Sequence, residues 1–498
     1  MDRDGTWGVP LWIRVALVAV AVAVLGLRLA DRDLIPYILD EPKFQDSGEL
    51  GARTGTWPPL SPVIASLGVP YGPGPVWFYV VVHRVVGPRP ELSALAATLF
   101  LSLSQLALAA ALARALRGGV VLFASITVLL AGSPFLFFWS RLAWDVLAGY
   151  TAVALALLAV ARPLPAWRGA LVGVLLGLAL ASHPMTVPLV IAILCVLSWE
   201  ALQRRSAAGL VALLAAMVLI NVPYLEALQH APQHPRLPGG SGLAERLAAA
   251  PGRLWSELLE PARVLTTTGV DYFFDGAWVS FRSTLGIGAA LLSTGPVLAM
   301  LLAVLGLAGL AWTARFGAPT ARRIARIGAL TWIGHALLFT VLGLVVQPHY
   351  QLATWWLVPA GIGGLAMALL PGRVQLARGL LVLVWTVALA QVGFSQAWMR
   401  WIRAAGGTTG IHYSVPLSAQ RAVVREACST DRPNVALANR TALFPVSLLS
   451  VARSEPSCTG KRVGICPGDC PPLDATWRVV SLRYLAPPGG RLAPVARE

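Results

Sequence analysis

Two neighbouring carboxylates, Asp40 and Glu41, follow the first apolar segment of the chain. Adjacent carboxylates repel each other, so in a partly dry cleft one of them has a raised pKa unless a cation or metal neutralises the pair. A carboxyl group of that kind suits a general base that removes the proton of an attacking hydroxyl. The alternative is an acidic turn exposed to water, and the sequence leaves both interpretations open.

A basic and an acidic residue, Arg141 and Asp145, lie between two later apolar segments. On a continuous helix, residues four positions apart share a face and can form an ion pair. Charged groups at a membrane boundary are costly unless they are paired or used. The sequence therefore favours neither a simple ion pair nor a functional role for these two residues.

His349 and Tyr350 form a third group, beside Pro348 at the end of another apolar segment. Both side chains could donate hydrogen bonds to a phosphate. The alternative is a belt of aromatic side chains at the membrane interface.

The composition indicates what must position these residues. The chain has 498 residues, of which 56% are hydrophobic and 12% charged. That charged fraction is about half the usual share, which excludes a water-soluble protein of this size. The net charge of +16 does not indicate a nucleic-acid partner, because the bases form small groups between apolar runs. The sequence predicts a membrane protein.

Eleven apolar segments approach the roughly 20 residues that cross a bilayer as a helix. Placing the N-terminus in the cytoplasm and the C-terminus outside makes every inside loop rich in arginine, as the positive-inside rule requires. Val76–Val86 is too short to span and is predicted to be an interfacial or re-entrant helix. The predicted spans are 11–30, 92–113, 119–139, 146–161, 168–183, 186–203, 207–224, 290–313, 327–346, 351–370 and 378–399.

Two domains follow from this topology. Residues 1–399 form the membrane domain, with a first outer loop at 31–91 that carries the acidic motif and a long outer loop at 225–289. Residues 400–498 are predicted to form a small α/β domain outside the cytoplasm, with a helix over Leu417–Ala427 and strands over Asn434–Ala438 and Trp477–Tyr484.

The C-terminal domain holds four cysteines, which are Cys428, Cys458, Cys466 and Cys470. An even number of cysteines outside the cytoplasm predicts two disulfides, with the pairing open. A zinc site that uses Cys466 and Cys470 is the alternative.

The order of these motifs resembles that of the GT-C superfamily of integral-membrane glycosyltransferases, particularly the protein O-mannosyltransferases and the lipid A aminoarabinose transferases. The resemblance covers roughly residues 10–370. The motifs that carry it are Asp40-Glu41, Tyr71-Gly-Pro-Gly-Pro75, Ser140–Asp145, Trp167–Ala181 and His349-Tyr350.

The resemblance implies a GT-C-like fold and a hexosyl- or pentosyltransferase that uses a polyprenyl-phosphate-linked sugar as donor. Its site would face away from the cytoplasm, and an acceptor hydroxyl would displace the lipid phosphate with inversion. Asp40, or else Glu41, would act near the acceptor. Arg141, Asp145, His349 and Tyr350 would bind or orient the donor phosphate.

The chain departs from the lipid A branch at Tyr71, where an acidic residue and a lysine precede the proline motif in that branch. A divalent metal ion is therefore left open as a cofactor, and the acceptor (protein, lipid or glycan) is also open.

A transporter or flippase of lipid-linked substrates is the alternative function. Such proteins tend to have repeated halves or ionisable residues in mid-span, and neither feature is evident in this sequence. In either case we expect a multi-pass protein of the cytoplasmic membrane.

Overall fold

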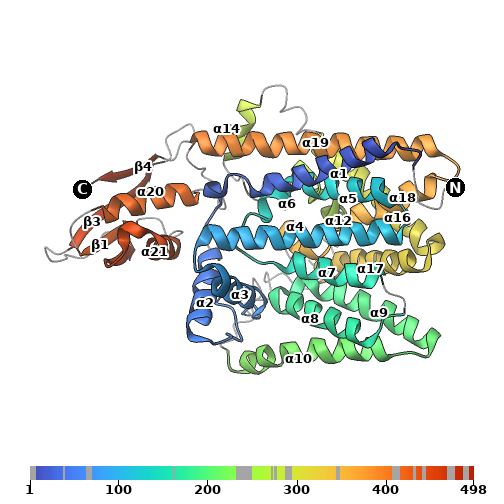
Figure 1. Cartoon of the computed structure of the whole chain (residues 1–498), viewed down its shortest axis with the longest axis horizontal. Helices are drawn as coiled ribbons and strands as arrows, with labels where there is room; N and C mark the ends of the chain where they lie inside the picture. Colours follow the sequence, from blue (N-terminus) through green and yellow to red (C-terminus); the bar gives the residue numbers. More distant parts are fainter. Residues whose placement is uncertain are drawn as a thin grey trace.

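The computed structural model shows long helices that run along one axis, with a small β-sheet at one end of the bundle (Figure 1). It describes residues 7–37, 40–62, 70–160, 163–231, 250–270, 273, 277–285, 294–343, 348–405, 416–429, 433–439, 445–467, 477–485 and 493–497.

Within these described ranges, seven helical segments are long and apolar enough to cross a membrane. A helical protein with many spans is therefore confirmed. The seven segments are Leu11–Leu29 (α1 and η1), Pro90–Ala115 (α4), Pro184–Arg204 (η3 and α9), Ala208–His230 (α10), Gly295–Phe316 (α16), Pro319–Leu342 (α17) and Val374–Ala405 (α19).

Five further apolar helices are shorter, and four of them fall in segments that the sequence predicted to span. Each of the eleven predicted segments thus contains one of these twelve helices, while the number of spans stays a prediction. The shorter helices are Gly74–Val86 (α3), Gly119–Gly132 (α5), Leu147–Val160 (α7), Ala166–Ser182 (α8) and Leu357–Leu369 (α18).

The predicted span at 119–139 is two helices, because α5 ends at Gly132 and α6 begins at Pro134 and ends at Trp139. The Ser133 side chain accepts a hydrogen bond from the N–H of Leu136, as a helix N-cap does. Proline suits the first position of a helix and cannot donate a hydrogen bond within one, so the chain restarts here.

Close helix pairs in the bundle meet at glycines. A Cβ atom built on Gly309 of α16 would overlap the carbonyl oxygen of Gly361 in α18. The same holds for Gly173 of α8 against the carbonyl of Leu213 in α10. Small residues let helix backbones approach closely in a membrane, where packing takes the place of a hydrophobic driving force.

The C-terminal domain is a four-stranded sheet with the order β2-β1-β3-β4 and the helices α20 (Leu417–Cys428) and α21 (Pro445–Ser454). Strand β1 is parallel to β2 and β3, and β4 is antiparallel to β3. The predicted helix and both predicted strands are present. The strands are β1 (Asn434–Asn439), β2 (Arg462–Pro467), β3 (Trp477–Leu485) and β4 (Ala493–Arg497).

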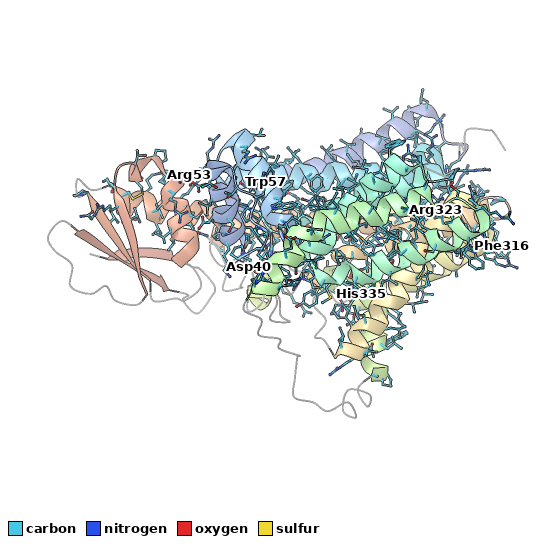
Figure 2. The ribbon with its side chains drawn as sticks, turned by 90° about the horizontal axis from the view of Figure 1, so that it is seen from below. Asp40, Arg53, Trp57, Phe316, Arg323 and His335 are labelled. Carbon is cyan, nitrogen blue, oxygen red and sulfur yellow. A yellow bond between two sulfur atoms is a disulfide. The ribbon has the colours of Figure 1, made fainter. Side chains whose placement is uncertain are left out.

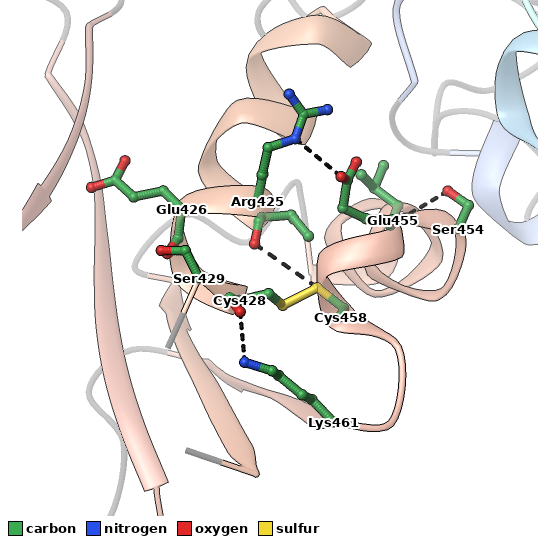
Figure 3. Close-up of a disulfide and its surroundings, with 10 residues drawn as sticks. Arg425, Glu426, Cys428, Ser429, Ser454, Glu455, Cys458 and Lys461 are labelled. Atoms are coloured by element: carbon green, nitrogen blue, oxygen red, sulfur yellow. Dashed lines mark hydrogen bonds and ion pairs between the residues drawn. A yellow bond between two sulfur atoms is a disulfide. The ribbon is translucent and has the colours of Figure 1, made fainter. Parts of the chain in front are cut away.

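A disulfide joins Cys428 to Cys458, with their Cα atoms 5.2 Å apart (Figure 3). It connects the end of α20 to the short turn η6 (Pro456–Cys458). Cys470 and the side chain of Cys466 lie outside the described residues, so the second predicted disulfide and the zinc alternative stay predictions.

The C-terminal domain docks on the segment that follows the first span, which the sequence predicts to be the first outer loop. The backbone N–H of Leu417 donates to the carbonyl of Ile35 (2.9 Å), and the Gln420 amide donates to the carbonyl of Tyr37 (2.9 Å). The Tyr37 hydroxyl also lies 2.7 Å from the Ser450 hydroxyl of α21. These bonds hold the start of the first loop against both helices of the C-terminal domain.

Candidate active site

Side chains from distant parts of the chain converge around the imidazole of His183. Its ring centroid lies 5.1 Å from that of Tyr71, 5.4 Å from that of Tyr350 and 6.3 Å from that of His349. Tyr350 and His349 belong to the 3-10 turn η5 (Pro348–Ala353). The sequence motifs at 71 and at 349–350, nearly 280 positions apart, therefore share one site.

The two predicted aspartates face the same cluster. Burial raises the pKa of the Tyr71 hydroxyl, and the charges of Tyr350, Asp145 and Asp40 raise it further. Figure 2 shows Asp40 at the end of the bundle next to the C-terminal domain, with Arg323 at the opposite end. Acidic groups and hydrogen-bond donors therefore meet at one end of the membrane domain.

Two tryptophans hold His349. Its ring stacks on Trp139, with centroids 5.9 Å apart and planes 4° apart, and also on Trp144 at 6.3 Å. Trp139 ends α6, and Trp144 lies in the second outer loop. The aromatic-belt interpretation of His349 is thus too simple, because the ring lies in a packed cluster with His183 and Tyr350.

A spacing of four would place Asp145 and Arg141 on one face of a continuous helix, but the two residues do not lie on a helix. The segment 140–146 consists of turns and bends, since α6 ends at Trp139 and α7 begins at Leu147. One Asp145 carboxylate oxygen accepts the N–H of Leu147 at 2.7 Å. Burial raises the pKa of Asp145 to about 7, against the opposing effect of that hydrogen bond.

Arg141 anchors the second outer loop to the first span. Its guanidinium donates to the carbonyl oxygens of Arg28 (3.1 Å), Ala30 (2.6 Å) and Asp31 (2.5 Å), and only 2% of the residue is exposed. These contacts indicate a structural role for Arg141. Its predicted role at the donor phosphate stays a prediction.

Asp40 and Glu41 differ in accessibility. Asp40 precedes helix α2 (Glu41–Thr54), its side chain is 23% exposed, and it accepts a hydrogen bond from the Lys43 ammonium at 2.9 Å. Glu41 is fully buried in the first turn of α2. Its charge is one of the groups that raise the pKa of Tyr37, after burial of that hydroxyl. Of the two carboxylates, Asp40 is the one that an acceptor could reach.

His183 is a further residue of the candidate site. Its Nδ1 accepts the N–H of Met185 at 3.2 Å, so the neutral ring carries its proton on Nε2. In the described part of the chain Nε2 has no hydrogen-bond partner, although the residue is only 6% exposed. Burial lowers the pKa of His183 to about 3, which keeps the ring neutral. The one sequence signal was a His-Pro step at the end of an apolar segment.

The donor set does not fit a metal ion. Across the described ranges, no three His, Cys, Asp or Glu side chains gather closely enough to hold one. Tyr71 also stands where the lipid A branch carries charged residues. We therefore derive no chemical step through a metal.

Among known proteins, two structures of ArnT align over most of this chain. No family model and no curated protein matches the sequence. Among solved structures, ArnT from Cupriavidus metallidurans in the apo state aligns at 16% identity over 91% of this chain and 85% of ArnT, with a TM-score of 0.45. ArnT bound to undecaprenyl phosphate aligns at 17% identity over 91% and 89%, with a TM-score of 0.41.

Proposed function

We propose that this protein transfers a sugar from a polyprenyl-phosphate-linked donor to an acceptor hydroxyl at the outer face of the cytoplasmic membrane. The observation that carries the proposal is the convergence of two aspartates with His183, His349 and Tyr350 at one end of an apolar helical bundle. The order of the sequence motifs supports the same chemistry.

Asp40 is our choice for the general base. The acceptor oxygen attacks the anomeric carbon, its proton passes to the Asp40 carboxylate, and the bond from carbon to the phosphate oxygen breaks. The sugar ends on the acceptor with inverted configuration, and polyprenyl phosphate leaves with the electron pair. The partial exposure of Asp40 gives the acceptor access to it, whereas Glu41 is enclosed.

The opposite side of the site suits the leaving phosphate, which gains negative charge in the transition state. His183 supplies an Nε2–H that has no partner in the described structure, and Tyr350 supplies a hydroxyl. Both residues are more than nine-tenths buried. Fixed donors in a dry site stabilise developing charge without reorganising, so they favour the transition state over the ground state.

The charge distribution supports an outward-facing site. Arg323 lies at the end of the bundle opposite Asp40 (Figure 2), near the start of α17, which also carries Arg322 and Arg326, and Arg315 lies in the last turn of α16. Basic segments tend to stay in the cytoplasm, which supports an outside location for the Asp40 end. The polyprenyl chain can then remain in the lipid while its phosphate reaches the rim of the bundle.

Replacing Asp40 tests this function. Purified Asp40→Asn should lose at least 100-fold in transfer from a radiolabelled polyprenyl-phosphate sugar, because the proton acceptor is removed while the side-chain shape is kept. Expression and membrane insertion should be unchanged. The matched control is Glu49→Gln on the same helix, which should keep the wild-type rate.

Two results would contradict the proposal. Near-normal rates in both Asp40→Asn and Glu41→Gln would show that the base is misassigned. Movement of the intact labelled lipid across vesicles, with no release of sugar, would identify a flippase instead.

A further inference from the structure

We infer that Glu257 and His335 form a buried pair that positions the η5 turn, so that Glu257 acts on the site through His335. The inference rests on the proposed function of the η5 side chains. Glu257 contacts His335, and His335 contacts the backbone of the turn, and we therefore treat both as positioning residues.

The pair lies behind η5, where α12 (Ala250–Arg263) packs against α17. A carboxylate oxygen of Glu257 is 3.8 Å from Nδ1 of His335, and the two side chains are 1% and 2% exposed. Nε2 of His335 is 3.2 Å from the carbonyl oxygen of Tyr350. His335 thus stands between a buried acid and the backbone of the turn.

The partners of His335 fix its protonation. A carbonyl oxygen only accepts, so Nε2 carries the hydrogen that bonds to Tyr350. Nδ1 of the neutral ring then accepts, and the Gln351 amide nitrogen is 3.5 Å from it. The ring also stacks on Phe339, with centroids 4.4 Å apart. One imidazole therefore contacts two consecutive residues of η5 while packed in a single orientation.

The buried Glu257 carboxylate is stable only if a proton or a nearby cation neutralises its charge. Both of its carboxylate oxygens are buried and lack a hydrogen-bond partner among the described residues. A buried, unpaired carboxylate is strongly unfavourable. One proton on this pair removes that cost in either form, as a neutral acid beside a neutral ring or as a carboxylate beside an imidazolium. Both forms keep the Nε2 hydrogen on the carbonyl of Tyr350.

The charged groups around Glu257, together with its burial, determine the pH at which its proton is lost. On its own helix lie Arg253, Glu260 and Arg263, and Glu260 is ion-paired with Arg263. The elements packed against α12 carry His335 on α17 and His349 and Tyr350 on η5, while η4 (Thr267–Gly269) and α18 contain no titratable side chain. The remaining ionisable groups of α17 and α16 are arginines, which are Arg322, Arg323, Arg326 and Arg315. Burial, and then the charge of Glu260, raise the pKa of Glu257 to about 8.

Loss of the proton should therefore disturb the turn at alkaline pH. Above about pH 8 the wild-type protein would hold an anionic Glu257 against a neutral ring. We expect kcat to fall there and amide hydrogen exchange of peptides covering 348–354 to rise. Glu257→Gln cannot ionise, so it should keep kcat within about threefold at pH 7 and lose the alkaline fall. His335→Ala should lower kcat at least 10-fold, and His335→Asn should restore part of it because its amide can donate to the carbonyl.

Glu260→Gln is the matched control on the next turn of α12. It should keep the alkaline fall but move it to lower pH, since one charge that raises the pKa of Glu257 is removed. The inference is overturned if Glu257→Gln keeps the wild-type alkaline fall, or if His335→Ala keeps wild-type kcat and exchange. The exchange readout requires no sugar transfer. If exchange responds as expected while no variant or wild-type protein transfers sugar, the positioning role holds and the proposed function fails.

Discussion

Asp145 and Arg141 are both buried in the segment between α6 and α7, but they have different partners. Arg141 donates to carbonyl oxygens at the end of the first span, whereas Asp145 accepts from the start of α7. Burial without a countercharge disfavours the carboxylate, which accounts for a pKa of about 7 for Asp145. Asp145 can therefore change charge in the physiological range, next to groups that we expect to face a phosphate.

Replacing Asp145 should change the pH dependence of donor binding. In the wild-type protein, ionisation above about pH 7 puts a negative charge near the donor phosphate, so the KM for the donor should rise with pH. Asp145→Asn stays neutral and should keep the low KM up to pH 9. Steady-state kinetics from pH 6 to pH 9 check this. Loss of activity in Asp145→Asn at every pH would instead show that the carboxylate itself is required.

The sequence identified the acids and the His-Tyr pair but not their environment. Asp40, Asp145, His349 and Tyr350 stood out because polar groups beside apolar segments are rare and expensive. The contacts of Arg141 could not be predicted, because a spacing of four has meaning only on a continuous helix and the chain leaves the helix at Ser140. His183 does not stand out in the sequence, because its importance comes from a buried Nε2–H without a hydrogen-bond partner among the described residues, which only the folded environment creates.

At the scale of elements, glycine contacts set the distance between helices. Gly309 and Gly361 let the backbones of α16 and α18 touch. Gly169 and Gly209 do the same for α8 and α10. Apolar length predicted where helices form, since a bilayer demands it. It did not predict the break at Ser133-Pro134 or the helix α12 inside the long outer loop, which depend on capping and on tertiary contacts with α17.

Gly309→Leu should destabilise the helical bundle. The added side chain has no space against Gly361, and overpacking of this kind typically costs about 1–3 kcal/mol. The control is Gly379→Leu on α19, where a Cβ atom meets nothing within 4 Å. Size-exclusion profiles after heating in detergent should show a lower midpoint for Gly309→Leu and no shift for Gly379→Leu. Equal midpoints would show that α16 and α18 do not pack as described.

At the scale of the whole molecule, the C-terminal domain and the first outer loop form one unit. Besides the bonds of Tyr37, the Arg453 guanidinium pairs with Asp46 of α2 at 3.1 Å and Arg421 pairs with Glu91 at 2.5 Å. Such partly exposed pairs contribute about 0–1 kcal/mol each, so most of the docking energy comes from buried contacts such as that of Leu417. The sequence predicted a separate domain, and nothing in its composition indicated which loop the domain contacts.

The disulfide should matter for this domain alone. Cys428 and Cys458 are 30 positions apart, and a loop of that length predicts about 3.7 kcal/mol of stabilisation. The double variant Cys428→Ser/Cys458→Ser should lose roughly 500-fold in amide-exchange protection over α20 and leave α4 unchanged. Cys195→Ser, at the unpaired cysteine of α9, is the control. Unchanged protection of α20 in the double variant would contradict the prediction.

The bond between Leu417 and Ile35 also constrains how the protein is made. A ribosome synthesises Ile35 and Tyr37 before their partners Leu417 and Gln420, which follow the long helix α19. The first loop therefore lacks these partners while the intervening helices enter the membrane. Helix α2, which begins directly after Asp40, is anchored by this late contact. The docking of the first loop on the C-terminal domain therefore cannot be completed in a nascent chain before Leu417 and Gln420 have been synthesised.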